Sequence, residues 1–250
     1  MDLETRQLQQ KLIQNGTCPE VIVLKPITTS TNDDVRELAK KGLKQVLVSS
    51  RIQTQGRGQR QREWVSPAGN VYLSTLLNLD KPVDGRLALE VALNILQMPS
   101  VQNLSLQVKW PNDLYSLQGK WGGILVEPIS SHQVIVGVGI NLNPVDVALD
   151  QEVTDLRSLG LPSHINTQDI RAELYHAIQT AGDWFNYNSH NLAARFNHYA
   201  AFIQQYVEFE DLKSTYQGLF LGIADDGAVK IKTEQGEKYI YQGRLRLQHM

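Results

Sequence analysis

Apolar runs with strand character, which follow one another across short turns, constrain the fold of this chain most strongly. Between residues 46 and 140 a helical pattern interrupts them at Leu87–Gln97, where Leu87, Val91 and Ile95 form one apolar stripe. A doubly wound βαβ fold needs a helix after nearly every strand, so this order favours an α+β fold with a mixed or antiparallel sheet flanked by helices. The expected strands are Val21–Leu24, Val46–Ser50, Val71–Leu77, Leu106–Trp110, Gly123–Glu127 and Val134–Ile140.

The rest of the chain indicates a second, smaller domain. A polar helix precedes the first strand, Ser30–Asn32 lies at the start of a further helix, and residues 167–206 have the pattern of two helices. Short alternating strands then follow, separated by turn signals such as Asp226-Gly227. We predict a main domain at 1–206 and a small C-terminal β-barrel domain at 207–250.

Composition argues against several classes of protein. No apolar run approaches the roughly 20 residues of a membrane helix, and the polar start lacks the pattern of a signal peptide. The lone Cys18 excludes an intramolecular disulfide and favours a reducing cytoplasm, where we expect the protein to reside. A formal net charge of −2 gives no electrostatic footprint for nucleic acid. Neither a membrane nor a nucleic acid is therefore an expected partner.

The segment Gly56–Trp64 reads GRGQRQREW and combines arginines with glycines. Guanidinium groups and backbone N–H groups donate to phosphate oxygens, which predicts a loop that closes over an anion, with Trp64 covering a ring or anchoring the loop. Because the chain as a whole is mildly acidic, this local charge favours a small anionic ligand over a polyanion. A solvated basic loop or an RNA-binding arginine cluster would have a similar composition.

Two lysine motifs follow the arginine loop. Lys109–Asp113, KWPND, ends an apolar strand with a lysine, an amide and a carboxylate, which suit phosphate, metal-bound water or an incoming amine. Lys120 stands shortly before Gly122 and Gly123, which would let a ligand or another backbone approach closely. Taken singly, the first motif could be a charged strand end and Lys120 a solvent-facing lysine.

Other chemical templates are missing from the sequence. Gly137–Asn143 begins like a dinucleotide-binding loop, but Leu142 stands where the third glycine is required and no helical pattern follows. No P-loop and no GxSxG nucleophile elbow occur, and the histidines lack metal-ligand spacing. We therefore expect no metal held by the protein alone and no covalent side-chain nucleophile.

Taken in order, the motifs between about Ile27 and Asn143 resemble those of the biotin–protein ligase family, whose members attach biotin to a lysine of biotin-dependent carboxylases. The ordered set is more specific than any single motif, and it consists of Ser30-Thr31-Asn32, Gln53-x-x-Gly56-Arg57-Gly58, Lys109–Asp113, Lys120–Glu127 and Gly137–Asn141. The resemblance implies a class II synthetase-like catalytic domain and an SH3-like barrel. It also implies that the carboxylate of biotin attacks the α-phosphate of ATP, and that the acceptor lysine of a biotin carboxyl carrier protein then displaces AMP.

The resemblance further implies roles for single residues. Biotin would be bound by Ser30, Thr31, Asn32, Gln53, Gly56, Arg57, Gly58, Gln59, Lys120, Gly122 and Gly123, and ATP by Arg57, Trp64, Lys109, Asn112 and Asn141. As catalytic residues, Lys120 would offset charge between the biotin carboxyl and the α-phosphate, Arg57 would close the loop, and Asp113 would receive the acceptor amine or its proton. Mg²⁺ would arrive on the phosphates rather than in a protein cage.

The arginine loop departs from the family's commonest form, which reads nearer GRGRRGRxW. Gln59 replaces an arginine and Gln61 replaces a glycine. Because one cation is lost, we expect measurable escape of the biotinyl-AMP intermediate from this protein. An assay of intermediate release checks this against a Gln59→Arg variant, and equal retention by both proteins would refute it.

Two other functions fit parts of the sequence. A lipoate or octanoyl ligase has a similar fold, but those families lack the Gly-Arg-Gly loop paired with Lys-Trp-Pro-Asn-Asp. An RNA-binding module could use the arginines and the β tail, and the acidic pI of about 6.3 speaks against it. Few residues precede Ser30, so we do not expect a DNA-binding repressor. A homodimer is compatible with the sequence, which does not fix the oligomeric state or the range of acceptors.

Overall fold

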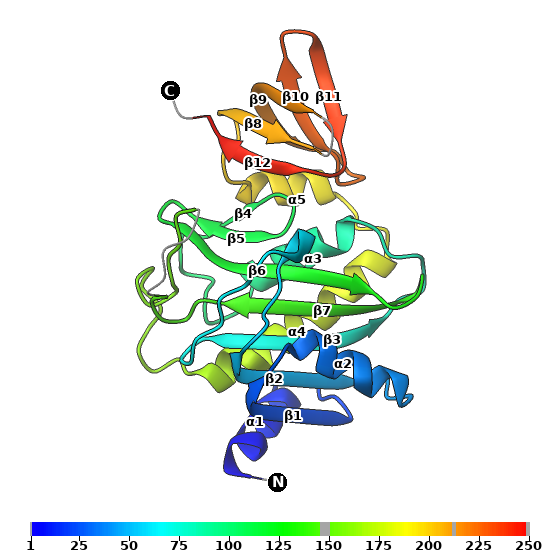
Figure 1. Ribbon diagram of the computed structural model, residues 1–250, viewed down its shortest axis with the longest axis vertical. Coiled ribbons are helices and arrows are strands. Elements are labelled where there is room, and N and C mark those ends of the chain that lie inside the picture. Colours follow the sequence, from blue (N-terminus) through cyan, green and yellow to red (C-terminus); the bar gives the residue numbers. More distant parts are fainter. Residues whose placement is uncertain (1, 146–150, 212–213, 249–250) are drawn as a thin grey trace.

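The protein is built on two β-sheets, and helices cover both faces of the first (Figure 1). A computed structural model describes residues 2–145, 151–211 and 214–248. The first sheet has seven strands in the order β1-β2-β3-β7-β6-β5-β4. They are β1 (Val21–Thr28), β2 (Val46–Gln53), β3 (Val71–Asn78), β4 (Gln107–Lys109), β5 (Asp113–Ser116), β6 (Gly119–Pro128) and β7 (Gln133–Ile140). Strands β1 and β2 are parallel and the remaining neighbours are antiparallel, which confirms the expected mixed sheet.

Alternation along the strands separates two apolar layers. Leu47 of β2 points into the main core, where α1 (Leu3–Gln14) and α3 (Arg86–Leu96) pack against α4 (Thr167–Asn186). Its neighbours Val46 and Val48 point to the opposite face and pack in a smaller cluster with Val35 of α2 (Thr31–Lys40). Polar side chains can therefore gather beside α2 without disturbing the main core.

The second sheet is open. Its antiparallel strands follow the order β11-β10-β9-β8-β12 and are β8 (Tyr206–Glu210), β9 (Thr215–Ile223), β10 (Val229–Thr233), β11 (Gly236–Ile240) and β12 (Arg244–Leu247). The end strands β11 and β12 share no pairing in the described part of the chain, so the expected SH3-like barrel at 207–250 is not confirmed. Alternation within single strands indicates strands, whereas closure depends on their tilt and stagger, which alternation does not encode.

The second sheet is anchored to the first at the end of β4. In Figure 1, α5 (Leu192–Tyr199) lies between the two sheets. Trp110 is buried, donates from Nε1 to the carbonyl oxygen of Gly227 at 3.0 Å, and lies 5.6 Å from Phe209 between ring centroids. The lysine motif that begins at Lys109 is thus held by β4 of the first sheet and by the contacts of Trp110 with the second sheet.

Most expected elements are confirmed and three short strands were missed. β5, β8 and β12 have four or five residues each; YVEFE in β8 and RLRL in β12 alternate, so the pattern of these two strands was present in the sequence and was overlooked. β1 continues through Pro26. Proline has no backbone N–H group, but β1 is an edge strand, so an N–H that points away from the sheet is not needed for pairing. Within the described ranges, no helix is both long and apolar enough to cross a bilayer.

Candidate active site

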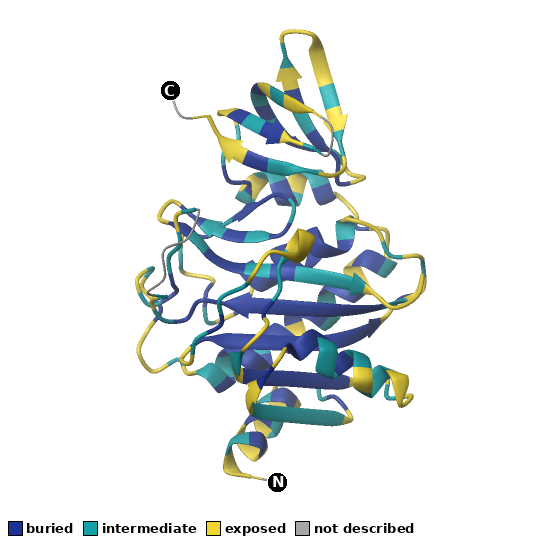
Figure 2. Ribbon diagram, in the orientation of Figure 1, coloured by how far each residue is buried: buried dark blue, intermediate teal, exposed yellow. Residues whose placement is uncertain are grey.

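A cavity of about 360 Å³ lies on the sheet face that carries α2. Strand register brings its floor together, because Gly123 pairs with Gly139, and Leu125 pairs with Gly137 two residues along. The loop after β2 crosses in front of these buried strands and is largely exposed on its outer side (Figure 2). The cavity is therefore enclosed between the sheet, the start of α2 and this loop.

Hydroxyl and amide groups form a connected network at the start of α2. The backbone N–H and Oγ1 of Thr31 both donate to Oε1 of Gln53, at 2.9 and 3.1 Å. Oγ of Ser74 lies 2.6 Å from both Oγ1 of Thr31 and Oδ1 of Asn32. Thr31, Asn32 and Ser74 are all buried, and Ser30 precedes the helix without a side-chain cap bond. The network fixes donors and acceptors at one end of the cavity before any ligand enters.

The strand glycines make room for these side chains. A Cβ atom on Gly137 would lie 2.2 Å from Oδ1 of Asn32, and one on Gly139 would lie 2.5 Å from Nε1 of Trp64. Such contacts are far inside van der Waals separation, so larger residues would displace Asn32 and Trp64. The Gly-x-Gly motif serves to seat cavity side chains and does not bind a dinucleotide by a strand–helix turn.

Two lysines flank one carboxylate at the other end of the cavity. Nζ of Lys120 lies 2.5 Å from Oδ1 of Asp113, and Nζ of Lys109 lies 3.6 Å from Oδ2. These side chains are 12%, 8% and 14% exposed for Lys120, Lys109 and Asp113. Burial lowers the pKa of Lys109. Nζ of Lys120 also lies 5.0 Å from the ring centroid of Trp64, a cation–π contact. The cluster places concentrated positive charge where an anion can reach it.

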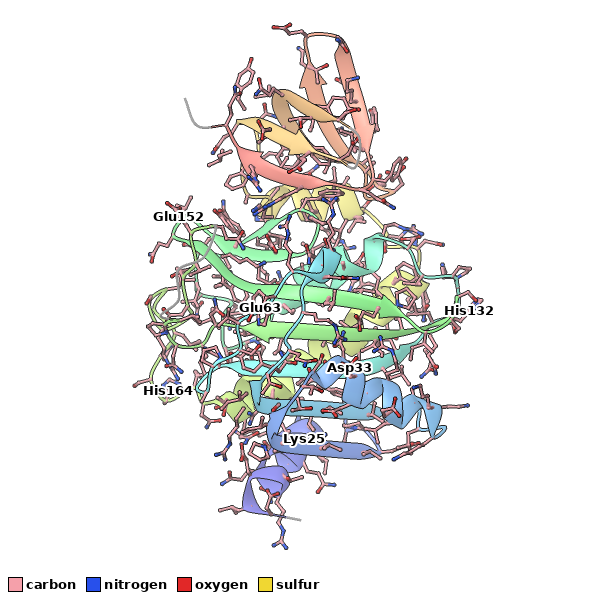
Figure 3. The ribbon with its side chains drawn as sticks, in the orientation of Figure 1. Lys25, Asp33, Glu63, His132, Glu152 and His164 are labelled. Carbon is pink, nitrogen blue, oxygen red and sulfur yellow. The ribbon has the colours of Figure 1, made fainter. Side chains whose placement is uncertain are left out.

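The arginine loop is tied to the first turn of α2. NH1 and NH2 of Arg57 donate to the two carboxylate oxygens of Asp33, both at 2.7 Å. These hydrogen bonds are the main reason that the pKa of Asp33 is lowered and that of Arg57 is raised. Asp33 at the start of α2 and Glu63 on the loop are labelled in Figure 3. The loop therefore covers the cavity in this conformation.

The loop backbone has a left-handed conformation at the position where this chain has glutamine in place of the family's glycine. Gln61 has a φ of 59° and Arg60 a φ of 56°, both in the left-handed region that favours glycine. The glycine that the family commonly has at position 61 would adopt this conformation without strain. Gln59 lines the cavity at the start of the same short 3₁₀ turn, Gln59–Gln61.

Asn112 and Asn141 hold the backbone around the lysine cluster. Nδ2 of Asn112 donates to the carbonyl oxygen of Ile124 at 2.6 Å, and Nδ2 of Asn141 donates to that of Thr154 at 3.1 Å. Nε1 of Trp64 is buried and has no hydrogen-bond partner among the described residues. This N–H packs against Gly139, so an acceptor on a ligand would reach it only if the indole ring shifted.

Most residues singled out from the sequence do meet at this cavity. Those that line it are Ser30, Thr31, Asn32, Gln53, Arg57, Gly58, Gln59, Trp64, Lys109, Asn112, Asp113, Lys120, Gly123 and Asn141. Gly56 and Gly122 are not among the lining residues. A Cβ atom on Gly56 would lie 2.3 Å from the carbonyl oxygen of Trp64, so this glycine shapes the loop. Gly122 lies within β6 and faces the main core, where a Cβ atom would lie 2.9 Å from Cδ1 of Leu114.

Several residues at or beside the cavity were not identified from the sequence. Ser74 is buried, and the signal available in the sequence was a hydroxyl residue inside an apolar strand. Glu127 accepts from Nδ2 of Asn32 at 2.9 Å, and its place at the end of a strand gave no distinct signal. Gly243 and Arg244 reach the cavity from the second sheet, which only the three-dimensional structure reveals.

Comparisons with known proteins agree with this geometry. A model described as the biotin/lipoate A/B protein ligase family matches residues 23–141. The chain is 27% identical over 258 residues to a bifunctional ligase/repressor BirA of Bacillus spizizenii, covering 96% of this chain and 79% of that protein. It is 32% identical over 169 residues to a biotin–[acetyl-CoA-carboxylase] ligase of Mycobacterium tuberculosis, covering 64% of this chain and 63% of that protein.

A solved structure has the same fold. The biotin protein ligase from Aquifex aeolicus in complex with biotin and ATP aligns with a TM-score of 0.79 and 22% identity, covering 92% of this chain and all (100%) of that one. At this identity the likeness concerns the fold, and it includes both sheets because nearly the whole chain is aligned.

Proposed function

We propose that this chain, which matches the model of the biotin/lipoate A/B protein ligase family over residues 23–141, is a member of that family, activates biotin with ATP as biotinyl-5′-AMP and transfers the biotinyl group to an acceptor lysine. The acceptor is the biotin carboxyl carrier protein of acetyl-CoA carboxylase, as the name of the mycobacterial relative suggests. One observation carries the proposal: a single cavity joins a neutral hydrogen-bonding network at one end to a lysine–carboxylate cluster at the other.

The neutral end suits the ureido ring of biotin. A ureido group has a carbonyl acceptor and two N–H donors, and Thr31, Asn32, Ser74 and Gln53 offer both kinds of partner in fixed positions. Lipoate ends in a dithiolane ring without such groups, so it would bury this network without satisfying it. Each unsatisfied buried group costs about 1–3 kcal/mol, which favours biotin over lipoate.

The charged end suits the reacting carboxylate and phosphate. When the biotin carboxylate attacks the α-phosphorus, a P–O bond forms, the bond to pyrophosphate breaks, and negative charge builds on the oxygens between them. Lys120 is placed to offset that charge, and a preformed cation does so without reorganising during the reaction. Asp113 holds Lys120 in place until the nucleotide draws the ammonium toward the phosphate. Its carboxylate is then free to take the proton of the acceptor amine, which displaces AMP from the acyl carbon.

The nucleotide would lie under the arginine loop. Trp64 lines the cavity and offers its ring, while Lys109 together with the turn fixed by Asn112 and Asn141 forms the phosphate side. Mg²⁺ would enter on the phosphates of ATP. Arg57 and Gly58 would cover the mixed anhydride and shield it from water.

We assign residues 1–206 to the catalytic domain and give the second sheet, at 207–250, a supporting role. Gly243 and Arg244 line the cavity, and Phe209 packs on Trp110 beside the lysine motif. Closure of the nucleotide end by this sheet fits these contacts.

The direct test incubates the pure protein with ATP, Mg²⁺, biotin and a biotin carboxyl carrier domain. We expect the carrier to gain the mass of one biotinyl group, and we expect no gain in a carrier whose acceptor lysine is replaced by arginine. Lipoate in equal concentration should not compete. Modification by lipoate in preference to biotin would assign the protein to the other branch of the family.

A further inference from the structure

The cation at the centre of the arginine loop is held by a carboxylate that does not itself line the cavity. Arg57 is a lining residue and Asp33 is not, although the two side chains form a two-bond ion pair. Asp33 sits in the first turn of α2, directly after Asn32 of the hydrogen-bonding network. The pair therefore joins the loop that carries Arg57 to helix α2.

The geometry of the pair fixes the orientation of the guanidinium group. A two-bond contact between Arg and a carboxylate sets a plane as well as a position, which a single hydrogen bond cannot do. It uses one hydrogen on each terminal nitrogen of Arg57, and an arginine has five N–H donors. Arg57 can thus keep its contact with Asp33 and still donate to an anion in the cavity.

Neighbouring charges extend the contact across α2 to the sheet. Arg36 donates to Asp33 at 2.8 Å and to Oε2 of Glu127 at 2.9 Å, and Glu127 lies 3.7 Å from NH2 of Arg57. The same Oε2 accepts from Nδ2 of Asn32. Alternating charges therefore link the loop to the end of the cavity assigned to the ureido ring.

We propose that Asp33 is a positioning residue that holds Arg57, and with it residues 54–65, closed over the cavity and aimed at the anionic group of the substrate or the acyl phosphate. This inference rests on the proposed function for the identity of the anion. The tethering of the loop does not rest on it and can be measured without substrates.

The test uses Asp33→Asn, with Asp34→Asn as the matched control. Both substitutions remove one negative charge from the same helical turn, but Asp34 contacts Lys25 and Thr28 instead of Arg57. Trypsin cleavage after Arg60 and Arg62, both exposed in the loop, reports loop opening in the absence of any ligand. We expect cleavage to accelerate roughly tenfold in Asp33→Asn, the effect of losing one charge-assisted hydrogen bond, and to stay within about twofold in Asp34→Asn. Equal rates in the two variants would overturn the tether.

A second arm connects the tether to the reaction. In biotin-dependent pyrophosphate exchange we expect Asp33→Asn to raise the KM for biotin roughly tenfold, with kcat changed less. The double variant Asp33→Asn/Arg57→Ala should match Arg57→Ala alone, because Asp33 acts through Arg57. Additive losses would contradict the inference. If trypsin cleaves the wild-type protein slowly but the protein shows no biotin-dependent exchange, the proposed function and the assigned anion are refuted. The trypsin cleavage rates of the two variants would still show whether Asp33 holds the loop.

Discussion

Replacing Lys120 with alanine is expected to lower the rate of biotin adenylation by roughly 10²–10³-fold, the usual effect of removing one group that stabilises transition-state charge. Lys120 lies 2.5 Å from Asp113 and within the cavity, and the charge it offsets appears only as the carboxylate attacks phosphorus. The loss should therefore fall on kcat, with the KM for biotin changed by about twofold or less. Steady-state pyrophosphate exchange at varied biotin concentration measures both quantities.

The control for this prediction is Lys120→Arg. Arginine keeps the positive charge but not the compact geometry of the ammonium group, so this variant should retain part of the rate. The neighbouring Lys109, 3.6 Å from Asp113, remains in both proteins. Exchange by Lys120→Ala at the rate of the unmodified protein would show that the charge is offset elsewhere.

Replacing Arg195 with methionine is expected to destabilise the protein by about 3–5 kcal/mol, because it leaves a buried carboxylate without its counter-ion. Glu90 on α3 is 0% exposed, and its two oxygens accept from NH1 and NH2 of Arg195 on α5 at 2.9 and 2.5 Å. Arg195 also stacks on Trp184, 4.1 Å from the ring centroid. Urea unfolding followed by circular dichroism gives the change in free energy of unfolding.

Two further variants test the cause of that loss. The double variant Glu90→Leu/Arg195→Met removes both charges and should recover most of the stability, since an apolar pair can replace a buried ion pair. Glu37→Gln breaks the exposed pair between Glu37 and Lys40, whose side chains are 63% and 64% exposed, and should cost at most about 1 kcal/mol. A loss for Arg195→Met no larger than for Glu37→Gln would contradict the assigned cost of burying Glu90.

The fold was largely predictable because its strands carry local signals. Val134–Ile140 is an apolar run bounded by polar turns, and the observed strand begins one residue earlier at Gln133. Whether the second sheet closes into a barrel was not predictable from such local signals. Whether β11 meets β12 depends on tilt and stagger summed over the whole sheet, and no residue in either strand specifies that sum.

The site was predictable where ordered motifs supplied its residues, and less so where contacts cross the fold. Thr31, Asn32 and Lys120 were identified from motifs, and the structure brings them to one cavity. Asp33 was not identified, because its acidic side chain at a helix start has an ordinary explanation in the helix dipole. Its contact with Arg57, 24 positions along the chain, depends on where the loop returns across the sheet.

The most direct measurement of the central claim is the exchange of labelled pyrophosphate into ATP by the purified protein. It reports formation of the acyl-adenylate alone, without an acceptor or a second step. A cavity that sets the biotin carboxylate beside the α-phosphorus predicts exchange that requires both biotin and Mg²⁺ and that Lys120→Ala slows by roughly 10²–10³-fold. Label that fails to enter ATP in the presence of biotin would contradict the account.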